Sequence, residues 1–145
     1  MRVVIVDDSA KIRNDLKMLV GRLGWEVVGE GETGIEAIEL VEKLKPDLLT
    51  LDIIMPEMDG IECYRQLRQK KASCKCIIVS VLASEPRVLQ AFEKEIYTTH
   101  FLKKPIVERD FRDRVEEILK MEPFPRPPVE ISETAPSDVS TSQVQ

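Results

Sequence analysis

The sequence has little of what several large classes of protein depend on. It carries one histidine, three cysteines and a net charge of −5 at pH 7, and this acidic balance argues against a nucleic-acid surface. No apolar run approaches the roughly 20 residues that a membrane-spanning helix needs. Residues 1–6 lead straight into a strand pattern and do not resemble a signal peptide. We therefore expect a cytoplasmic protein that binds neither nucleic acid nor membrane.

The few cysteines also argue against a metal–thiolate site. Cys74 and Cys76 form a close pair, but the sequence has no second pair and its only histidine, His100, is remote. A structural zinc site needs about four such ligands. With Cys63, these residues are therefore expected to be reduced thiols.

Apolar patterns instead indicate strands and helices that alternate along residues 1–121. This alternation predicts an α/β fold, a doubly wound five-stranded parallel sheet with helices on both faces. Strands are predicted at 3–6, 25–28, 48–51, 76–79 and 98–102. Helices are predicted after caps at Ser9, Thr33 and Asp59, from Pro86, and over 108–121.

The composition changes near the end of the last predicted helix. Residues 123–145 hold five of the nine prolines, many serines and threonines, and no amphipathic period. Such a segment buries little apolar area and is expected to stay disordered. We therefore predict a domain over 1–121 and a tail or linker over 122–145, with residues 123–145 contributing nothing to the fold.

Polar residues stand where the predicted strands end. They are Asp7 and Asp8, then Asp52, Ser80 and Lys104, and the carboxyl ends of parallel strands share one edge of the sheet. Three gathered acids would repel each other without a cation, and oxygen ligands favour Mg²⁺ beside phosphate. Singly, Asp8 has a plainer interpretation as a helix cap and Lys104 as a solvated charge. Their order favours an Mg²⁺-assisted phosphoryl site with Asp52 as the nucleophile.

At these strand ends the sequence resembles the receiver domain of bacterial two-component response regulators, over roughly residues 1–121. The matching stretches are VIVDDS at 4–9, LDIIMPEMDG at 51–60, IIVS at 77–80 and FLKKP at 101–105. The resemblance implies the flavodoxin-like strand order 2-1-3-4-5. It also implies that Asp52 accepts a phosphoryl group from a sensor histidine kinase or a phosphotransfer protein, and that the domain signals by altered protein binding.

The same resemblance implies roles for the other site residues. Mg²⁺ would be held by Asp7, Asp8, Asp52 and the backbone carbonyl of Ile54. Lys104 would contact the phosphoryl group, and Ser80 would move toward it while Phe101 rotates inward as the aromatic switch. The resemblance also predicts a cis peptide bond before Pro105.

The sequence departs from the family pattern near the output region. Val81 replaces a small residue, the Gly-Ala pair before the last strand is missing, and the segment from Ser80 to Lys104 is about two residues longer than usual. Ile54 and Leu82 stand where polar side chains would position a hydrolytic water. Since neither forms hydrogen bonds through its side chain, slow dephosphorylation is expected.

Three alternatives differ in function class. A phosphatase of the haloacid-dehalogenase type also uses an Asp nucleophile and Mg²⁺, but it places a second acid where this chain has Ile54. A mononucleotide binder would need a glycine-rich phosphate loop, which is missing. The chain is therefore not expected to be an enzyme. The third alternative is the N-terminal receiver of a longer effector protein, because the sequence around Asp52 resembles that of receivers attached to chemotaxis methylesterases. The sequence does not identify the kinase or the output partner.

Overall fold

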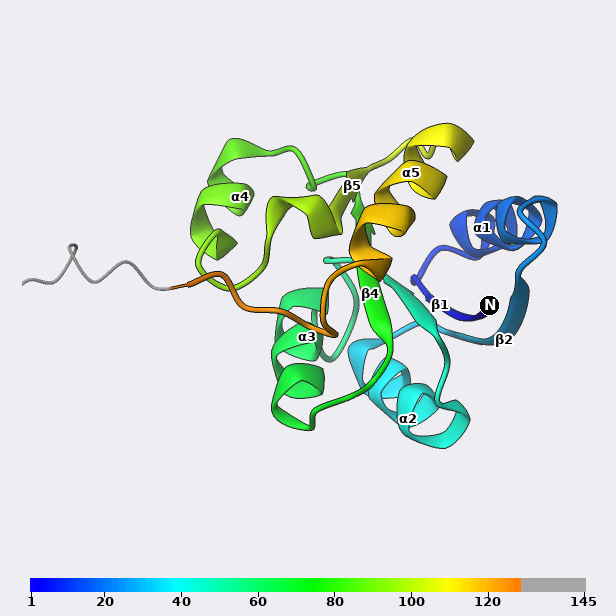
Figure 1. Cartoon of the computed structure of the whole chain (residues 1–145), viewed down its shortest axis with the longest axis horizontal. Coiled ribbons are helices and arrows are strands. Elements are labelled where there is room, and N and C mark those ends of the chain that lie inside the picture. Colours follow the sequence, from blue (N-terminus) through cyan, green and yellow to red (C-terminus); the bar gives the residue numbers. More distant parts are fainter. Residues whose placement is uncertain (129–145) are drawn as a thin grey trace, which may run out of the picture.

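The structure is a computed structural model that describes residues 1–128, in which strands and helices alternate along the chain (Figure 1). The five strands form one parallel sheet in the predicted order β2-β1-β3-β4-β5. The strands are β1 (Arg2–Val6), β2 (Glu26–Gly31), β3 (Leu48–Leu51), β4 (Lys75–Ser80) and β5 (Phe101–Lys103). The helices are α1 (Ala10–Arg22), α2 (Gly34–Leu44), α3 (Gly60–Gln69), α4 (Pro86–Phe92) and α5 (Glu108–Leu119), with the 3₁₀ helix η1 (Thr98–His100) before β5.

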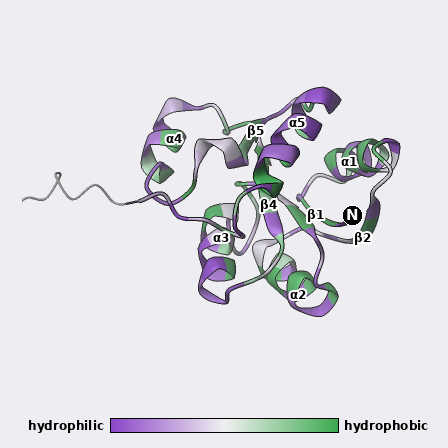
Figure 2. Ribbon diagram, in the orientation of Figure 1, coloured by the Kyte–Doolittle hydropathy of each residue, from purple (hydrophilic) through white to green (hydrophobic). Residues whose placement is uncertain are grey.

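Helices cover both faces of the sheet, as the alternation predicts. On one face α1 and α5 bury Leu16 and Phe111 against β1 and β4. On the other face α2 and α3 bury Val41 and Tyr64. Figure 2 shows hydrophobic colouring along the central strands and hydrophilic colouring along much of α5. In residues 1–128 no helix has both the length and the hydropathy needed to cross a membrane.

Local capping chemistry explains where three helices begin. At each predicted cap a side-chain oxygen accepts a hydrogen bond from a backbone N–H of the first turn, which would otherwise lack a partner. These bonds join Ser9 Oγ to the Ile12 amide (3.3 Å), Thr33 Oγ1 to the Glu36 amide (3.1 Å) and Asp59 Oδ1 to the Glu62 amide (2.8 Å). The three predicted caps are confirmed.

The region before β5 differs from the prediction of a strand over 98–102. Thr98–His100 is a 3₁₀ helix, because the His100 amide donates to the Tyr97 carbonyl (2.9 Å) and closes a tight turn. Strand β5 begins only at Phe101. Helix α5 ends at Leu119 instead of residue 121. The segment between Ser80 and Lys104 therefore contains turns, α4, η1 and the short strand β5.

The first residues of the predicted tail pack against the domain. Phe124 is 2% exposed and Pro125 is buried, so the expectation that residues 123–145 contribute nothing is wrong for these positions. The physical reason is Tyr64, whose buried hydroxyl donates to the Pro125 carbonyl (3.2 Å) and whose ring packs on Phe124. The rest of the predicted tail, 129–145, lies outside the described residues.

Candidate functional site

The carboxyl ends of β1 and β3 bring three acids together. Asp7 and Asp8 follow β1, and Asp52 follows β3, the neighbouring strand. One carboxylate oxygen from each residue lies within 4.8 Å of the others. Asp7 is 1% and Asp52 6% exposed, whereas Asp8 is exposed. The structure thus gathers the three predicted acids into one cluster that is open at Asp8.

Lys104 reaches the same cluster from the end of β5. Its Nζ lies 2.7 Å from Asp7 Oδ2 and 3.1 Å from Asp52 Oδ2. Its amide donates to the Ser80 carbonyl (3.1 Å), which fixes the point at which the chain leaves the sheet. The bond between Lys104 and Pro105 is cis, and this prediction is confirmed.

Burial and pairing oppose each other at this site. Burial raises the pKa of Asp7, against the lowering effect of hydrogen bonds from Lys104 and from the Ser9 amide. Burial also disfavours the charged form of Lys104, but the nearby Asp7 and Asp52 outweigh it and raise the Lys104 pKa. A buried carboxylate is tolerated only when it is paired. The ammonium group of Lys104 therefore compensates two acids at once.

Ser80 lies on β4, the neighbour of β3, and Phe101 lies on β5, the edge strand beyond it. Ser80 ends β4 and is fully buried, and its hydroxyl oxygen accepts a hydrogen bond from the Leu82 amide (3.3 Å). Phe101 pairs with Ile78 at the start of β5 and is already buried in this structure. The hydroxyl is thus engaged with the loop after β4, and the ring occupies the core.

Two positioning residues were missed by the sequence reasoning. Gly60 stands in the sequence only as the last residue of the matching stretch 51–60, but a Cβ placed there would lie 2.0 Å from the Asp52 carbonyl oxygen. Arg13 was not singled out, yet its guanidinium donates to the Asp7 carbonyl (2.6 Å) and pairs with Glu30. The Asp-Gly dipeptide was a usable signal for the first residue, whereas α1 offers none for the second.

Apolar side chains stand on the exposed loops next to the cluster. Ile54 is 55% exposed and Val81 is 59% exposed, and they follow Asp52 and Ser80 in the chain. Leu82 is half-buried. The backbone carbonyl of Ile54 as a metal ligand stays a prediction.

The donor set of the cluster fits a hard cation. It consists of carboxylate oxygens, without thiolate or imidazole, and such a set favours Mg²⁺, Mn²⁺ or Ca²⁺. An ammonium beside two carboxylates also suits a group that carries several negative oxygens. Together, the doubly wound sheet and this edge define a class of α/β proteins that handle phosphoryl groups at the carboxyl ends of their strands.

Comparisons with known proteins identify the family. The model of the response regulator receiver domain matches residues 3–116. Chemotaxis protein CheY of Listeria monocytogenes is 38% identical over 120 residues, which are 83% of this chain and 96% of that protein. This chain belongs to the response regulator receiver domain family.

Solved structures agree with this assignment. The response regulator domain of Thermotoga maritima CheB superposes with a TM-score of 0.73 at 30% identity, covering 85% of this chain and 98% of that one. CheY in the CheX-CheY-BeF3-Mg complex of Borrelia burgdorferi gives a TM-score of 0.70 at 28% identity, covering 81% and 88%. The chain is therefore a receiver domain of two-component signalling.

Proposed function

We propose that Asp52 is the phosphoacceptor of this receiver domain and that a histidine kinase or a phosphotransfer protein is the donor. The observation that carries this proposal is the pairing of Asp52 Oδ2 with Lys104 Nζ at 3.1 Å, inside the cluster of Asp7, Asp8 and Asp52. A buried carboxylate at a strand end, with a cation beside it and an exposed acid at its open side, is placed to react with an incoming phosphorus atom.

The proposed transfer uses the residues of this cluster. An Asp52 oxygen attacks the phosphorus, the bond from phosphorus to the donor nitrogen breaks, and that nitrogen keeps the electron pair. Lys104 then follows the negative charge from the carboxylate to the phosphoryl oxygens. Asp7, Asp8, Asp52 and the Ile54 carbonyl would hold Mg²⁺. When bound, this ion supplies positive charge that lets carboxylates and phosphoryl oxygens share one site.

Signalling starts when the phosphoryl oxygens on Asp52 attract a nearby hydrogen-bond donor. The Ser80 hydroxyl oxygen accepts a 3.3 Å hydrogen bond from the Leu82 amide, and we propose that the hydroxyl leaves this bond and donates to a phosphoryl oxygen. Phe101 starts from a buried position, so the switch of this ring is a change of packing within the core next to η1. The output is a changed binding surface for a downstream protein, and the domain turns over no external substrate.

The setting of the protein is part of the same proposal. The three cysteines are free thiols, which fits a reducing compartment, and we place the protein in the cytoplasm. The Borrelia structure holds a CheY together with CheX, BeF3 and Mg, which supports Mg²⁺ and a partner protein for this chain by analogy.

Labelling with acetyl phosphate tests the assignment of Asp52. The parent should acquire an acid-stable, hydroxylamine-labile label that requires Mg²⁺ and disappears with EDTA. Asp52→Asn should not label, whereas Asp15→Asn, which removes an exposed carboxylate on α1, should label like the parent. Full labelling of Asp52→Asn would refute the assignment, and steady release of phosphate from p-nitrophenyl phosphate would show a phosphatase instead.

A further inference from the structure

The chain turns back after α5 and crosses the domain as an extended segment, which we call the strap (residues 121–128). In Figure 1 it runs from the end of α5 past α3 in orange. Phe124 and Pro125 are buried, while Glu122, Arg126 and Pro128 are exposed. The strap thus docks on the domain through two buried residues, Phe124 and Pro125.

Several specific contacts hold the strap. The rings of Tyr64 and Phe124 pack edge to face at 5.0 Å, and the Tyr64 hydroxyl donates to the Pro125 carbonyl (3.2 Å). Arg126 Nη2 lies 3.9 Å from Glu95 Oε2. Phe124 has a φ of 47°, a left-handed conformation that a bulky side chain adopts only when its surroundings compensate. The docking is therefore a specific fit and not a loose contact.

Tyr64 also touches the segment that leads to Phe101. Its ring packs edge-on against His100, with centroids 6.3 Å apart and planes at 82°. His100 is 1% exposed and directly precedes Phe101, and Tyr64, Phe101 and Phe124 belong to one buried cluster. One side chain of α3 thus contacts both the strap and the residue next to the proposed switch.

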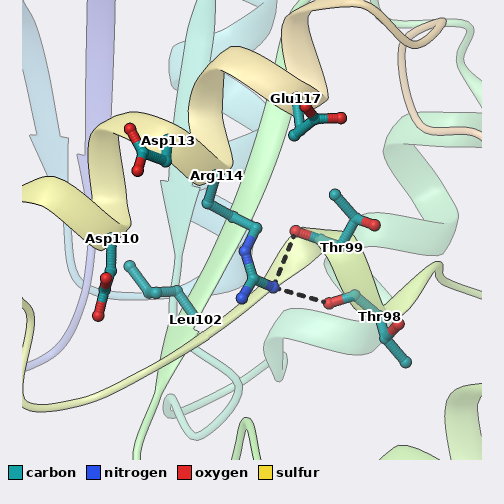
Figure 3. Close-up of a pocket in the computed structure, with 7 residues that line it drawn as sticks. All are labelled: Thr98, Thr99, Leu102, Asp110, Asp113, Arg114 and Glu117. Atoms are coloured by element: carbon teal, nitrogen blue, oxygen red, sulfur yellow. Dashed lines mark hydrogen bonds between the residues drawn. The ribbon is translucent and has the colours of Figure 1, made fainter.

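Helix α5 ties η1 to β5 from the other side. Arg114 donates to the carbonyls of Thr98 (3.2 Å), Thr99 (3.4 Å) and Phe101 (2.7 Å), and Figure 3 shows its side chain reaching from α5 to the two threonines. Three carbonyls held by one guanidinium make η1 and the start of β5 a single unit. A displacement of Phe101 therefore also displaces His100 against Tyr64.

We propose that α3 and η1 form a docking surface for a Phe-Pro-Arg segment, that the strap is its occupant, and that the docked strap favours the buried position that Phe101 has here, so that docking is coupled to phosphorylation of Asp52 through η1 and β5. This inference rests on the proposed function, because it gives the phosphoryl site a regulator within the same chain. Whatever factor phosphorylation applies to docking, docking must apply the same factor to the binding of a phosphoryl group or its mimic.

Fluorine NMR can follow the strap and the switch together. The chain has four phenylalanines, so 4-fluorophenylalanine labelling gives four resonances that Phe→Leu variants assign. Adding beryllofluoride and Mg²⁺ should change the resonances of Phe101 and Phe124, while Phe111, on the opposite face of the sheet, stays constant. A change at Phe101 without one at Phe124 would overturn the coupling and leave the proposed function intact.

Affinity for beryllofluoride gives the reciprocal test. The affinity of Phe124→Ala for beryllofluoride should differ from that of the parent by about fivefold, at the low end of typical coupling. Leu119→Ala, which removes an exposed apolar side chain at the end of α5, should match the parent. Equal binding by Phe124→Ala and the parent overturns the proposal.

A milder variant protects the test against unfolding. Tyr64→Phe keeps the ring and removes only the hydrogen bond to the Pro125 carbonyl, so it should shift the affinity in the same direction by a smaller factor. If Phe124→Ala does not fold, an unchanged affinity of Tyr64→Phe overturns the coupling. Failure of the parent to bind beryllofluoride or to label with acetyl phosphate would overturn the proposed function itself, and this inference with it.

Discussion

Gly60 offers the sharpest test of how the acidic site is positioned. It begins α3, and its amide donates to the Ile53 carbonyl (2.8 Å), so the start of the helix lies directly on the backbone after β3. A Cβ at this position would lie 2.0 Å from the Asp52 carbonyl oxygen and 3.0 Å from the Ile53 Cα. Gly60→Ala therefore pushes on the peptide that carries Asp52.

The size of the effect follows from these distances. Ordinary van der Waals contact begins at 3.4 Å, and the obstructing atoms belong to the backbone, which cannot rotate away as a side chain could. Either Asp52 or the start of α3 must move by more than 1 Å in relation to the other, by comparison of these two distances. Overpacking of this kind costs about 1–3 kcal/mol of stability, and a misplacement of about 1 Å at a reacting group lowers rates about 100-fold.

The assay compares Gly60→Ala with Gly21→Ala. The variant should label with acetyl phosphate about 100-fold more slowly than the parent, and its urea midpoint should fall. A Cβ at Gly21, on the exposed side of α1, meets nothing within 4 Å, so Gly21→Ala should label normally and gain about 0.5–1 kcal/mol. Parental labelling and stability in Gly60→Ala would refute the close approach as the reason for glycine.

Three further predictions concern stability and lifetime. A chain that ends at residue 121 should be about 2 kcal/mol less stable to urea than one that ends at 128, because burying Phe124 contributes roughly that much; equal midpoints would contradict the docking. Burial lowers the pKa of His100 to about 4, so as the pH falls the unfolded state binds a proton before the folded state does. The free energy of unfolding should therefore fall by about 2 kcal/mol from pH 8 to pH 5 in the parent. His100→Gln should not show this loss. The aspartyl phosphate of the parent is expected to last minutes to hours, and Ile54→Asn should shorten this lifetime about tenfold. Val107→Asn, at another exposed apolar position, should not change it. If Ile54→Asn loses its phosphoryl group as slowly as the parent, the apolar side chain of Ile54 is not the reason for slow hydrolysis.

Much of the fold could be predicted from the sequence because it depends on local sequence patterns. The capping residues Ser9, Thr33 and Asp59 act within one helical turn, and each forms the expected hydrogen bond. The sheet order came from the resemblance to receiver domains. The gathering of the acids followed from topology, since the carboxyl ends of adjacent parallel strands share one edge. These features need no knowledge of distant contacts.

The features that sequence reasoning missed depend on contacts between distant segments. Phe124 stands among prolines and polar residues in the sequence, and its burial depends on contacts with distant residues such as Tyr64 in α3. The close approach at Gly60 depends on the path of the backbone after Asp52. The 3₁₀ turn before β5 is stabilised by Arg114, which lies in α5. Apart from the Asp-Gly dipeptide at Gly60, no local pattern in the sequence encodes these pairings.

Helices α4 and α5 differ in how deeply their side chains are buried, and this difference bears on how a signal leaves the site. Phe111, Val115 and Ile118 anchor α5 with fully buried side chains, whereas α4 buries none of its residues completely and Phe92 is only half-buried. Segments with little burial open at a lower free energy than the core. A displacement that begins at Ser80 therefore meets less resistance toward α4 than toward α5. The strap docks near the segment that follows α4, where Glu95 binds Arg68 and Arg126. Its contacts therefore stabilise the part of the domain with the least buried surface.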